Sequence, residues 1–351
     1  MKGYTVVEMF AGVGGMTHGF LLEGFPVVAG FDSDENCKYP YEANNPGSRF
    51  NLKKIEETTP NEILNLFPEN HNKIFVGCAP CQPYSSYTKK KNSPGEKWKL
   101  IDLFGDLICS IKPEVVSMEN VPDLVRYEKG RVYDAFVTKL KQVGYYISEY
   151  PEVFCPQYGI PQIRTRLIFF ASKFGKVNLE DPQYPSDKYK TVRDTIYHLE
   201  HIEAGEISKV DPIHRSSRLS EINLRRIRSS YPGGTWRDWR EDLIAACHKK
   251  ASGASYRSVY GRMSWDQPSP TITTECHGYG NGRFGHPEQN RAISLREAAL
   301  LQTFPADYKF VEPGKPVYFD AVARLIGNAV PVDLGRVIAR SIRRHLEKYD
   351  G

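Results

Sequence analysis

Short apolar runs alternate with helical patterns over the first 170 residues of the chain. An apolar run over residues 4–10, broken only by Glu8, leads into a glycine-rich stretch and then a helical pattern. A second apolar run over residues 25–31 ends at Asp32. Strands that alternate with helices at this spacing predict a parallel sheet covered by helices on both faces. Further buried strands are expected at 74–77, 115–118 and 167–171, and further helices at 60–67, 100–111 and 132–144.

The pattern changes near residue 173. From there to about residue 290 the chain is rich in Pro, Gly, Ser, Tyr and Arg and has few long periodic segments, which predicts a second, loop-rich domain. Helical periodicity then returns, and Ser294 and Glu297 have the spacing of a capping box at a helix start. We therefore expect three parts: an α/β domain over 1–172, a smaller domain with its hinge over 173–320, and a segment over 321–351 that rejoins the first domain.

The composition is that of an ordinary globular protein. Apolar residues make up 40% of the 351 residues and charged residues 25%, so disorder and fibrous repeats are poor interpretations. The seven cysteines show no regular spacing, which argues against a disulfide scaffold and favours a reducing compartment. No window approaches the roughly 18 uninterrupted apolar residues of a spanning helix, and Glu8 interrupts the segment that would be apolar in a signal peptide. We expect a soluble, cytoplasmic protein.

The net charge of +5 is unevenly distributed. Residues 1–75 carry six Lys or Arg against ten Asp or Glu, whereas residues 209–262 carry twelve against five. Such asymmetry is typical of a polyanion-binding region beside a neutral or acidic domain. A solvated helical face is the alternative, and charge alone does not decide between the two.

The glycine-rich stretch is the first candidate site. Residues 10–15 read Phe-Ala-Gly-Val-Gly-Gly between a predicted strand and a predicted helix, so the backbone there can approach a ligand closely. Asp32 ends the next strand about twenty residues on, where a ribose hydroxyl is bound in nucleotide-binding folds. The glycine spacing departs from the dinucleotide fingerprint, which disfavours a nicotinamide cofactor. A plain strand–helix turn is the alternative.

The second candidate is the stretch Gly-Cys-Ala-Pro-Cys-Gln-Pro-Tyr-Ser over residues 77–85, which follows a predicted parallel strand. Open α/β sheets place their chemistry in such loops, and Cys81 between two prolines is a candidate thiolate nucleophile. Half of a zinc site is one alternative, but no second Cys or His pair completes it. A redox pair is another alternative, and a buried structural role is favoured for Cys78.

Two further motifs carry charged groups at predicted strand ends. Glu119 lies in Glu-Asn-Val after the strand at 115–118, where partial desolvation would let a carboxyl group donate a proton near neutral pH; an ordinary loop glutamate is the alternative. Gln162, Arg164 and Arg166 alternate at the start of the strand at 167–171, so they are expected to share one face. Two guanidinium groups there suit an anion or a carbonyl oxygen, and an exposed edge strand with solvated arginines is the alternative.

Taken together, these motifs resemble the DNA (cytosine-5) methyltransferase family. Their order is Phe-x-Gly-x-Gly-Gly, Pro-Cys-Gln, Glu-Asn-Val, Gln-x-Arg-x-Arg and finally Gly-Asn-Ala-Val-Pro at 327–331. The resemblance runs from Phe10 to Pro331, with residues 173–290 outside it. It implies a Rossmann-like class I methyltransferase sheet with helices on both faces and a smaller, loop-rich target-recognition domain. The stretch 291–305, including Glu297, Leu301 and Gln302, looks like the family segment that supports this domain.

The resemblance also implies a mechanism and its catalytic residues. The Cys81 thiolate would add to carbon 6 of cytosine, which makes carbon 5 nucleophilic toward the methyl group of S-adenosylmethionine. Glu119 would interact with ring nitrogen 3, and Arg164 and Arg166 would hold the base carbonyl and orient the catalytic loop. An unidentified base would then remove the carbon 5 proton, and the cysteine would leave 5-methylcytosine.

S-Adenosylmethionine is the cofactor that the resemblance implies, with no metal. Asp32 would hold its ribose, and Asn328 with its neighbours would open the last helix beside the glycine loop. The chain departs from the family pattern at Ser33, where many relatives carry a larger residue beside the adenine. It departs again at residues 53–55, Lys-Lys-Ile, which lack an acidic residue before the isoleucine. The implied cofactor-binding residues are Phe10, Gly12, Gly14, Gly15, Asp32, Ser33, Pro80 and Asn328.

Double-stranded DNA is the implied partner. The target base must leave the stack to react, and the basic region of the loop-rich domain would position the duplex through phosphate contacts. Residues 231–239 would read bases, although packing is favoured for Trp236 and Trp239. Lys89, Lys90 and Lys91 would contact phosphates near the target or form a solvated loop. The predicted DNA contacts are Gln82, Ser85, Arg225, Arg226 and Arg228.

The implied context is a prokaryotic, nucleoid-associated modification enzyme in the cytoplasm. We expect a monomer, with a cognate restriction endonuclease as a functional partner only; a solitary relative is the alternative. Transfer-RNA C5-methyltransferases carry a Cys-Phe-Thr motif that residues 276–280, Cys-His-Gly-Tyr-Gly, do not match. A non-catalytic nucleic-acid-binding protein is disfavoured by the intact Cys81, Glu119 and Arg164, and an oxidoreductase would explain only the glycine loop.

Overall fold

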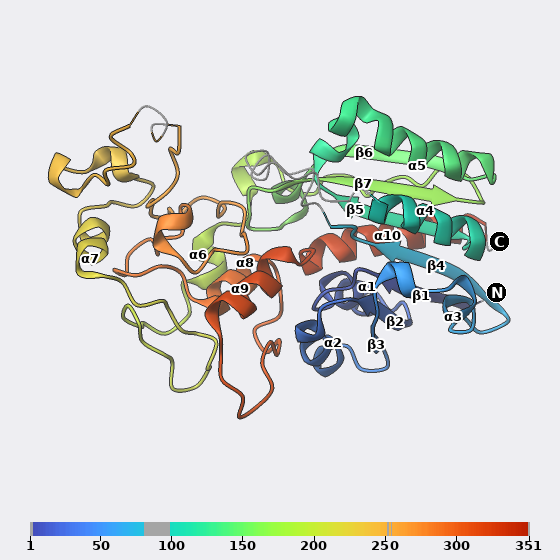
Figure 1. The fold of residues 1–351 in the computed structure, drawn as a ribbon, viewed down its shortest axis with the longest axis horizontal. Coiled ribbons are helices and arrows are strands. Elements are labelled where there is room, and N and C mark those ends of the chain that lie inside the picture. The colour runs from blue at the N-terminus through green and yellow to red at the C-terminus, as the bar shows by residue number, and fades with distance from the viewer. Residues whose placement is uncertain (1–2, 81–98, 251–252, 254, 350–351) are drawn as a thin grey trace. The chain divides into compact units, whose positions relative to one another are not determined.

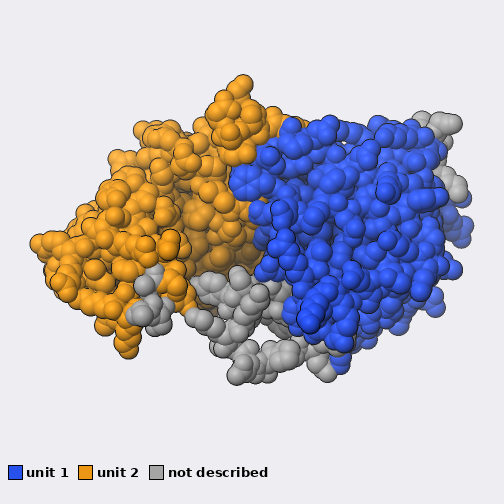
Figure 2. Space-filling model, turned by 90° about the horizontal axis from the view of Figure 1, so that it is seen from above, with its two compact units in different colours: residues 1–158, 165–182, 330–351 blue, residues 159–164, 183–329 orange. Residues whose placement is uncertain are grey.

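A computed structural model describes residues 3–80, 99–250, 253 and 255–349 of the chain. The chain forms two compact units (Figure 2). Unit 1 comprises residues 1–158, 165–182 and 330–351, and unit 2 comprises residues 159–164 and 183–329. The three-part division and the recognition role expected from the sequence stay predictions.

Unit 1 is built on a seven-stranded sheet with the order β3-β2-β1-β4-β5-β7-β6 (Figure 1). The first five strands in this order run parallel, whereas β7 is antiparallel to both β5 and β6. The fold is α/β as expected, but the expectation of a wholly parallel sheet is wrong at β7. The strands are β1 (Gly3–Met9), β2 (Val27–Asp32), β3 (Arg49–Leu52), β4 (His71–Gly77), β5 (Val115–Asn120), β6 (Tyr146–Phe154) and β7 (Thr165–Ser172).

The reversed strand has a simple topological cause. A parallel pair needs a crossover connection, usually a helix, but no α-helix lies between β6 and β7. The apolar pattern did not predict β6, because this edge strand has an irregular pattern of buried and exposed positions. It also missed β3, a four-residue strand at the other edge.

Six helices of the described residues belong to unit 1. Two of them end earlier than their patterns suggested, α3 at Leu64 and α5 at Gln142. The helices are α1 (Gly15–Leu22), α2 (Lys38–Asn44), α3 (Pro60–Leu64), α4 (Lys99–Ile111), α5 (Arg131–Gln142) and α10 (Val332–Glu347).

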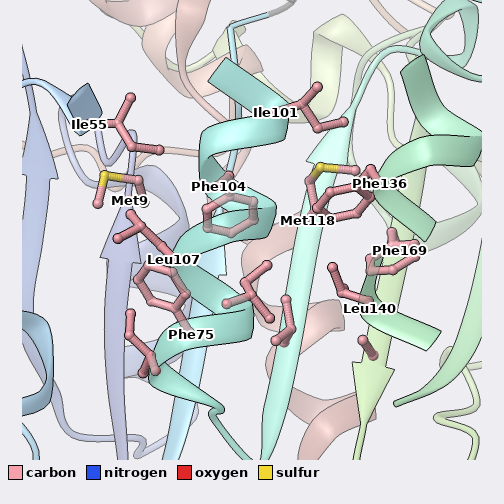
Figure 3. Packing of buried hydrophobic residues seen from close by; sticks show 14 of the residues in the cluster. Met9, Ile55, Phe75, Ile101, Phe104, Leu107, Met118, Phe136, Leu140 and Phe169 are labelled. Atoms are coloured by element: carbon pink, nitrogen blue, oxygen red, sulfur yellow. The ribbon is translucent and has the colours of Figure 1, made fainter. Parts of the chain in front are cut away.

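A continuous apolar core lies between α3, α4 and α5 and one face of the sheet (Figure 3). The buried residues of α4 recur at helical spacing, from Ile101 through Phe104 to Ile111. The Phe104 ring lies 5.2 Å from that of Phe75 in β4, measured between centroids. Burying one such side chain contributes about 1.5–3 kcal/mol, so this layer fixes the strand ends that carry the candidate site.

On the opposite face of the sheet, α1 and α10 cross at glycines. A Cβ atom added to Gly19 would lie 2.6 Å from the carbonyl oxygen of Val332, and one added to Gly335 would lie 3.1 Å from the backbone of Met16. The C-terminal helix therefore packs directly behind the glycine-rich loop that opens α1. Asn328 does not open this helix as expected, because it is the last residue of the preceding helix α9.

Unit 2 has few regular elements. The capping box expected at Ser294 and Glu297 is present at the start of α8. Trp236 and Trp239 are 7% and 6% exposed and share an apolar cluster with Ile227, which confirms the packing interpretation for both tryptophans. The helices of unit 2 among the described residues are α6 (Val192–Ile196), α7 (Glu221–Arg228), α8 (Leu295–Leu301) and α9 (Phe319–Asn328).

None of the helices within the described residues is both long enough and apolar enough to cross a membrane.

Candidate active site

The glycine-rich loop makes a tight turn between β1 and α1. Gly12 and Gly14 have φ angles of 53° and 88°, and the Gly14 N–H donates to the Ala11 carbonyl at 2.9 Å. These left-handed conformations favour glycine. Phe10 also has a positive φ, 60°, which costs a residue with a side chain about 1–2 kcal/mol. Its ring packs edge-on against Phe104, with centroids 6.1 Å apart, so the core pins this strained residue at the loop.

Asp32 at the end of β2 is hydrogen-bonded to the glycine-rich loop. Its Oδ2 accepts a hydrogen bond from the Gly12 N–H at 2.8 Å, and its Oδ1 accepts one from the Asp34 N–H at 2.9 Å. Burial raises the pKa of Asp32, although these backbone donors oppose the rise. The predicted pair of glycine loop and acidic residue is therefore one hydrogen-bonded unit.

A cavity of about 450 Å³ opens beside this unit. Four of the residues predicted to bind a cofactor, Phe10, Asp32, Ser33 and Pro80, lie in its wall. Asn328 is exposed and belongs to unit 2, whereas the cavity belongs to unit 1. The described residues that line the cavity are Met9, Phe10, Phe31, Asp32, Ser33, Lys53, Lys54, Ile55, Glu56, Pro80 and Leu100.

The cavity wall contains an acidic residue that the sequence analysis missed. Glu56 lines the cavity one position after the buried Ile55, whereas in the family pattern the acidic residue comes before the isoleucine. Lys53 is bound in place, because its N–H donates to the Asp32 carbonyl at 2.8 Å and its ammonium pairs with Glu62. The adjacency of Glu56 to Ile55 is the only sequence signal that could have identified it.

The strand ends of β4 and β5 bring Cys78 and Ala79 next to Glu119 and Asn120. Gly77 and Met118 are paired in register, so the residues that follow each of them meet. The Cys78 thiol donates to Glu119 Oε2 at 2.8 Å, and the Asn120 side-chain amide donates to the Ala79 carbonyl at 2.9 Å. Cys78 is partly exposed, so the expectation that it is buried is wrong. Cys81, Gln82, Ser85 and Lys89–Lys91 lie outside the described residues.

Glu119 is 2% exposed and contacts a cation on its second oxygen. The Arg166 Nε lies 2.8 Å from Glu119 Oε1. The two carboxylate oxygens thus face different groups, the Cys78 thiol and the Arg166 guanidinium. Glu119 is not an ordinary loop glutamate, because it is the buried second-last residue of β5.

Arg164 and Arg166 do not share one strand face as expected. Strand β7 begins at Thr165, so the alternation rule does not reach Arg164. The Arg164 guanidinium is buried and donates to Gln162 Oε1 at 3.2 Å and to the Ile272 carbonyl at 3.4 Å. The alternative of an exposed edge strand is also wrong, because β7 lies between β5 and β6.

Gln162 connects three distant segments of unit 2. Its amide donates to Gln302 Oε1 at 2.9 Å and to the Leu301 carbonyl, while its Oε1 accepts the N–H of Ile272 at 3.0 Å. Gln302 in turn donates to the carbonyl of Ile326 at 2.8 Å. Sequence reasoning had no signal for this network, since its members are up to 140 residues apart.

The three arginines predicted to contact DNA have different surroundings. Arg226 is half-buried, donates to the Leu243 carbonyl at 2.8 Å, and lies over the rings of Trp239 and Tyr260. Arg225 is exposed and pairs with Asp242 at 3.2 Å. Arg228 is exposed at the end of α7. The structure therefore gives Arg226 an internal role and leaves Arg225 and Arg228 on the surface.

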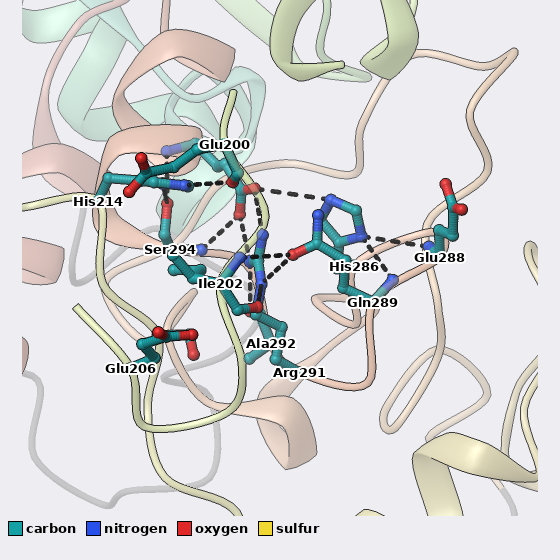
Figure 4. A network of polar contacts seen from close by, with 12 residues as sticks. Glu200, Ile202, Glu206, His214, His286, Glu288, Gln289, Arg291, Ala292 and Ser294 are labelled. Atoms are coloured by element: carbon teal, nitrogen blue, oxygen red, sulfur yellow. Dashed lines mark hydrogen bonds and ion pairs between the residues drawn. The ribbon is translucent and has the colours of Figure 1, made fainter. Parts of the chain in front are cut away.

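Unit 2 also holds a buried ion pair (Figure 4). The guanidinium of Arg291 binds both oxygens of Glu297 at 2.7 Å, and Ser294 N–H donates to the same carboxylate at 2.6 Å. Burial alone would raise the pKa of Glu297, but the charge and hydrogen bonds of Arg291 outweigh it and lower the pKa to about 2. Burial also lowers the pKa of His286 beside them to about 3. This cluster supports the capping box of α8.

The sheet, the glycine loop held by Asp32, and the ion pair of Glu119 with Arg166 at the adjoining ends of β5 and β7 define an α/β methyltransferase. The crystal structure of a prophage-encoded DNA modification methyltransferase of E. coli has the same fold, with a TM-score of 0.76 over 98% of this chain and 100% of that chain at 22% identity. The model of the C-5 cytosine-specific DNA methylase family matches residues 4–344, so the chain belongs to this family and is a DNA (cytosine-5) methyltransferase.

Curated relatives support the same family. The chain is 56% identical to the Type II methylase M.HgiDII of Herpetosiphon aurantiacus over 342 residues, which cover 97% of this chain and 96% of that protein. It is 32% identical to the Type II methyltransferase M.PspPI of Psychrobacter sp. over 98% of this chain and 80% of that protein. The family resemblance proposed from the motifs is therefore confirmed.

Proposed function

We propose that this enzyme methylates carbon 5 of a cytosine extruded from a specific double-stranded DNA sequence, with S-adenosylmethionine as methyl donor and Cys81 as covalent nucleophile. The observation that carries the proposal is the buried Glu119 between the Cys78 thiol and the Arg166 guanidinium. This carboxylate stands at the strand end that neighbours the loop leading to Cys81. Pro80, which directly precedes Cys81, also lines the cavity.

The residues at these strand ends divide the chemistry between them. The thiolate of Cys81 adds to ring carbon 6, carbon 5 then takes the methyl group, and loss of the carbon 5 proton expels the thiolate. Glu119 supplies a proton or hydrogen bond to ring nitrogen 3 as charge develops there, and Arg166 keeps its carboxylate oriented. Asn120 fixes the Ala79 carbonyl and so orients the chain just before the nucleophile. Arg164 donates to the side-chain oxygen of Gln162 and so positions that residue.

The cavity in unit 1 fits a nucleoside with a charged tail. It combines the apolar surface of Phe10 and Phe31 with the carboxylates of Asp32 and Glu56, which suit the hydroxyl groups of a ribose and the amino group of a base. S-Adenosylmethionine would supply an activated methyl group there. Ser33 and Glu56 are the residues we assign to the adenine side, because both line the cavity together with Ile55.

A glycine variant tests this cofactor assignment. Gly14→Val forces a β-branched residue into a left-handed conformation with φ 88° at the loop, so it should abolish binding of S-adenosylmethionine in calorimetry. Gly144→Val is the matched control, since Gly144 has the same φ of 88° with nothing within 4 Å of an added Cβ. Equal affinities for the two variants would reject the loop as the cofactor site.

The substrate proposal rests on the basic region of unit 2 and on the relatives. Arg225 and Arg228 are exposed on α7, where phosphate contacts would position a duplex. The relatives are named Type II methylases, so we propose a restriction–modification context with a cognate endonuclease as functional partner. The enzyme is proposed to act as a monomer in the prokaryotic cytoplasm.

Substrate choice is tested with purified protein and a methyl-labelled donor. Incubation with double-stranded DNA and, separately, with transfer RNA should label the DNA alone, and bisulfite sequencing should place 5-methylcytosine in one recurring sequence. Label in transfer RNA alone would leave the chemistry intact and overturn the DNA assignment. Methylation in random sequence context would overturn the assignment to a sequence-specific modification enzyme.

A further inference from the structure

Glu8 is a buried acidic side chain of unit 1 that the proposed chemistry does not use. It lies in β1 two residues before Phe10 and is 1% exposed. On the neighbouring strand β2 it is paired in register with Gly30. Its Oε2 accepts a hydrogen bond from the Thr17 hydroxyl of α1.

Thr17 starts a chain of buried hydroxyl groups. The Thr17 Oγ1 lies 3.1 Å from the Tyr41 hydroxyl of α2, which lies 2.6 Å from the Ser48 Oγ. A Cβ atom on Gly30 would lie 2.5 Å from the Tyr41 hydroxyl, so the space for this chain depends on a glycine opposite Glu8. Residues from β1, α1, α2 and β2 thus enclose one carboxyl group with hydroxyl partners instead of a cation.

This chain of hydroxyl groups begins in the helix that follows the glycine loop. Thr17 is the third residue of α1, whose N-cap is Gly14. Among the described residues, the titratable groups that interact electrostatically with Glu8 are Asp32 of β2 and Tyr41 of α2. Asp32 is the residue that holds the Gly12 N–H, so Glu8 lies among the groups that shape the proposed cofactor site.

Burial keeps the carboxyl group of Glu8 protonated near neutral pH. Burial raises the pKa of Glu8 to about 8, with hydrogen bonds from Thr17 lowering it and the negative charge of Asp32 raising it further. Each hydroxyl group in the chain both donates and accepts. The hydroxyl groups can therefore donate toward Glu8 when it is ionised and accept from Glu8 when it is protonated. The hydrogen bond between Glu8 and Thr17 is kept in both states.

We propose that Glu8 is a positioning residue for the cofactor loop: through Thr17 it fixes the first turn of α1, and the loss of its proton is coupled to binding of the cationic methyl donor. The proposal rests on the proposed function, which makes S-adenosylmethionine the ligand of this loop. The sulfonium group is positive, and its attraction to an ionised carboxylate grows as the dielectric constant between them falls. Binding of the donor therefore favours ionised Glu8 and releases a proton, whereas the uncharged thioether of S-adenosylhomocysteine gives a smaller release.

The test is calorimetric and needs no turnover. S-Adenosylmethionine is titrated into the wild-type protein and into Glu8→Gln at pH 7.5, in two buffers of different ionisation enthalpy, so that proton release is measured with affinity. For wild type we expect release of a fraction of a proton, and a Kd that falls as pH rises through 8, about tenfold for each pH unit by which binding shifts the ionisation. For Glu8→Gln, which keeps the shape, we expect the part of the release that comes from Glu8 to disappear, so that the pH dependence that remains is that of the donor's own α-amino group.

Two further variants keep the test decisive. Thr17→Val removes the hydroxyl link and should move the pH dependence of binding upward, and it replaces Glu8→Gln if that variant does not fold. Ser148→Ala is the matched control: it removes a buried hydroxyl of β6 that has no hydrogen-bond partner among the described residues, and it should bind like wild type. Unchanged proton release and pH dependence in Glu8→Gln or Thr17→Val would overturn the proposal. No binding of the donor by wild type would overturn the proposed function with it.

Discussion

Two buried glutamates, one in each unit, have opposite electrostatic surroundings. Glu8 in unit 1 is held by hydroxyl groups, and burial raises its pKa to about 8. Glu297 in unit 2 is equally buried, but the bidentate guanidinium of Arg291 lowers its pKa to about 2. The guanidinium that binds both oxygens of Glu297 keeps this carboxylate charged, whereas a buried carboxyl group that has hydroxyl partners, such as Glu8, can exchange a proton near neutral pH. The carboxylate of Glu297 thus serves the scaffold of unit 2, whereas Glu8 in unit 1 is bonded to the first turn of α1, which follows the proposed cofactor loop.

The largest effect is expected from breaking the charged pair. Arg291→Met leaves the carboxylate of Glu297 buried without its cation, which should lower the free energy of unfolding by about 3–5 kcal/mol. Thermal unfolding at pH 7 measures the loss. The double variant Arg291→Met with Glu297→Leu should recover much of it, because no charge then stays buried. A double variant as unstable as the single one would show that packing, not charge, is lost.

Removing the titratable group in unit 1 should change the pH dependence of stability. A carboxyl group whose folded pKa is raised stabilises the fold below its unfolded pKa of 4.5, and this contribution is lost as pH rises toward 8. Glu8→Gln should therefore be more stable than wild type above pH 8, by about 1.4 kcal/mol for each pH unit of the shift that is realised. Thermal melts of both proteins from pH 5 to about pH 9 measure this. Parallel stability curves would mean that Glu8 is not protonated in the folded enzyme.

Two basic side chains of α7 in unit 2 are expected to have different roles, Arg226 in stability and Arg228 in DNA binding. Arg226→Ala should cost about 1–2 kcal/mol of stability, because it removes a hydrogen bond to a carbonyl and contacts with two rings. Arg228→Ala should leave stability unchanged but flatten the log–log salt dependence of DNA binding by about 0.9. Unfolding and binding measured on both variants distinguish the two roles. An unchanged salt slope for Arg228→Ala would remove it from the DNA contacts.

The sequence predicted the parts of the fold that leave an apolar signature. Strands β1, β2, β4, β5 and β7 all appeared as buried apolar runs, but the edge strands β3 and β6 did not, because one is very short and the other alternates irregularly. Missing β6 hid the connection that reverses β7. An apolar run indicates burial and not strand direction.

The candidate site was predictable where its residues follow strand ends. Phe10, Asp32, Ser33 and Pro80 meet at one cavity, as their positions after neighbouring strands require. Contacts between distant segments were not predictable, such as Gln162 with Gln302. Charge counts likewise could not show that Arg226 is internal, because burial depends on tertiary packing. Glu8 was visible only as an interruption of an apolar run.

The most direct test of the account is covalent trapping on a fluorinated substrate. Duplex DNA with 5-fluorocytosine at the target position cannot lose a proton from carbon 5, so the adduct with the nucleophile should persist through denaturing electrophoresis when S-adenosylmethionine is present. The account predicts a trapped complex for wild type and for Cys78→Ser, and none for Cys81→Ser, because a serine hydroxyl is far less ionised than a thiol at neutral pH. A complex that persists in Cys81→Ser, or DNA methylation by that variant at a rate comparable to wild type, would contradict it.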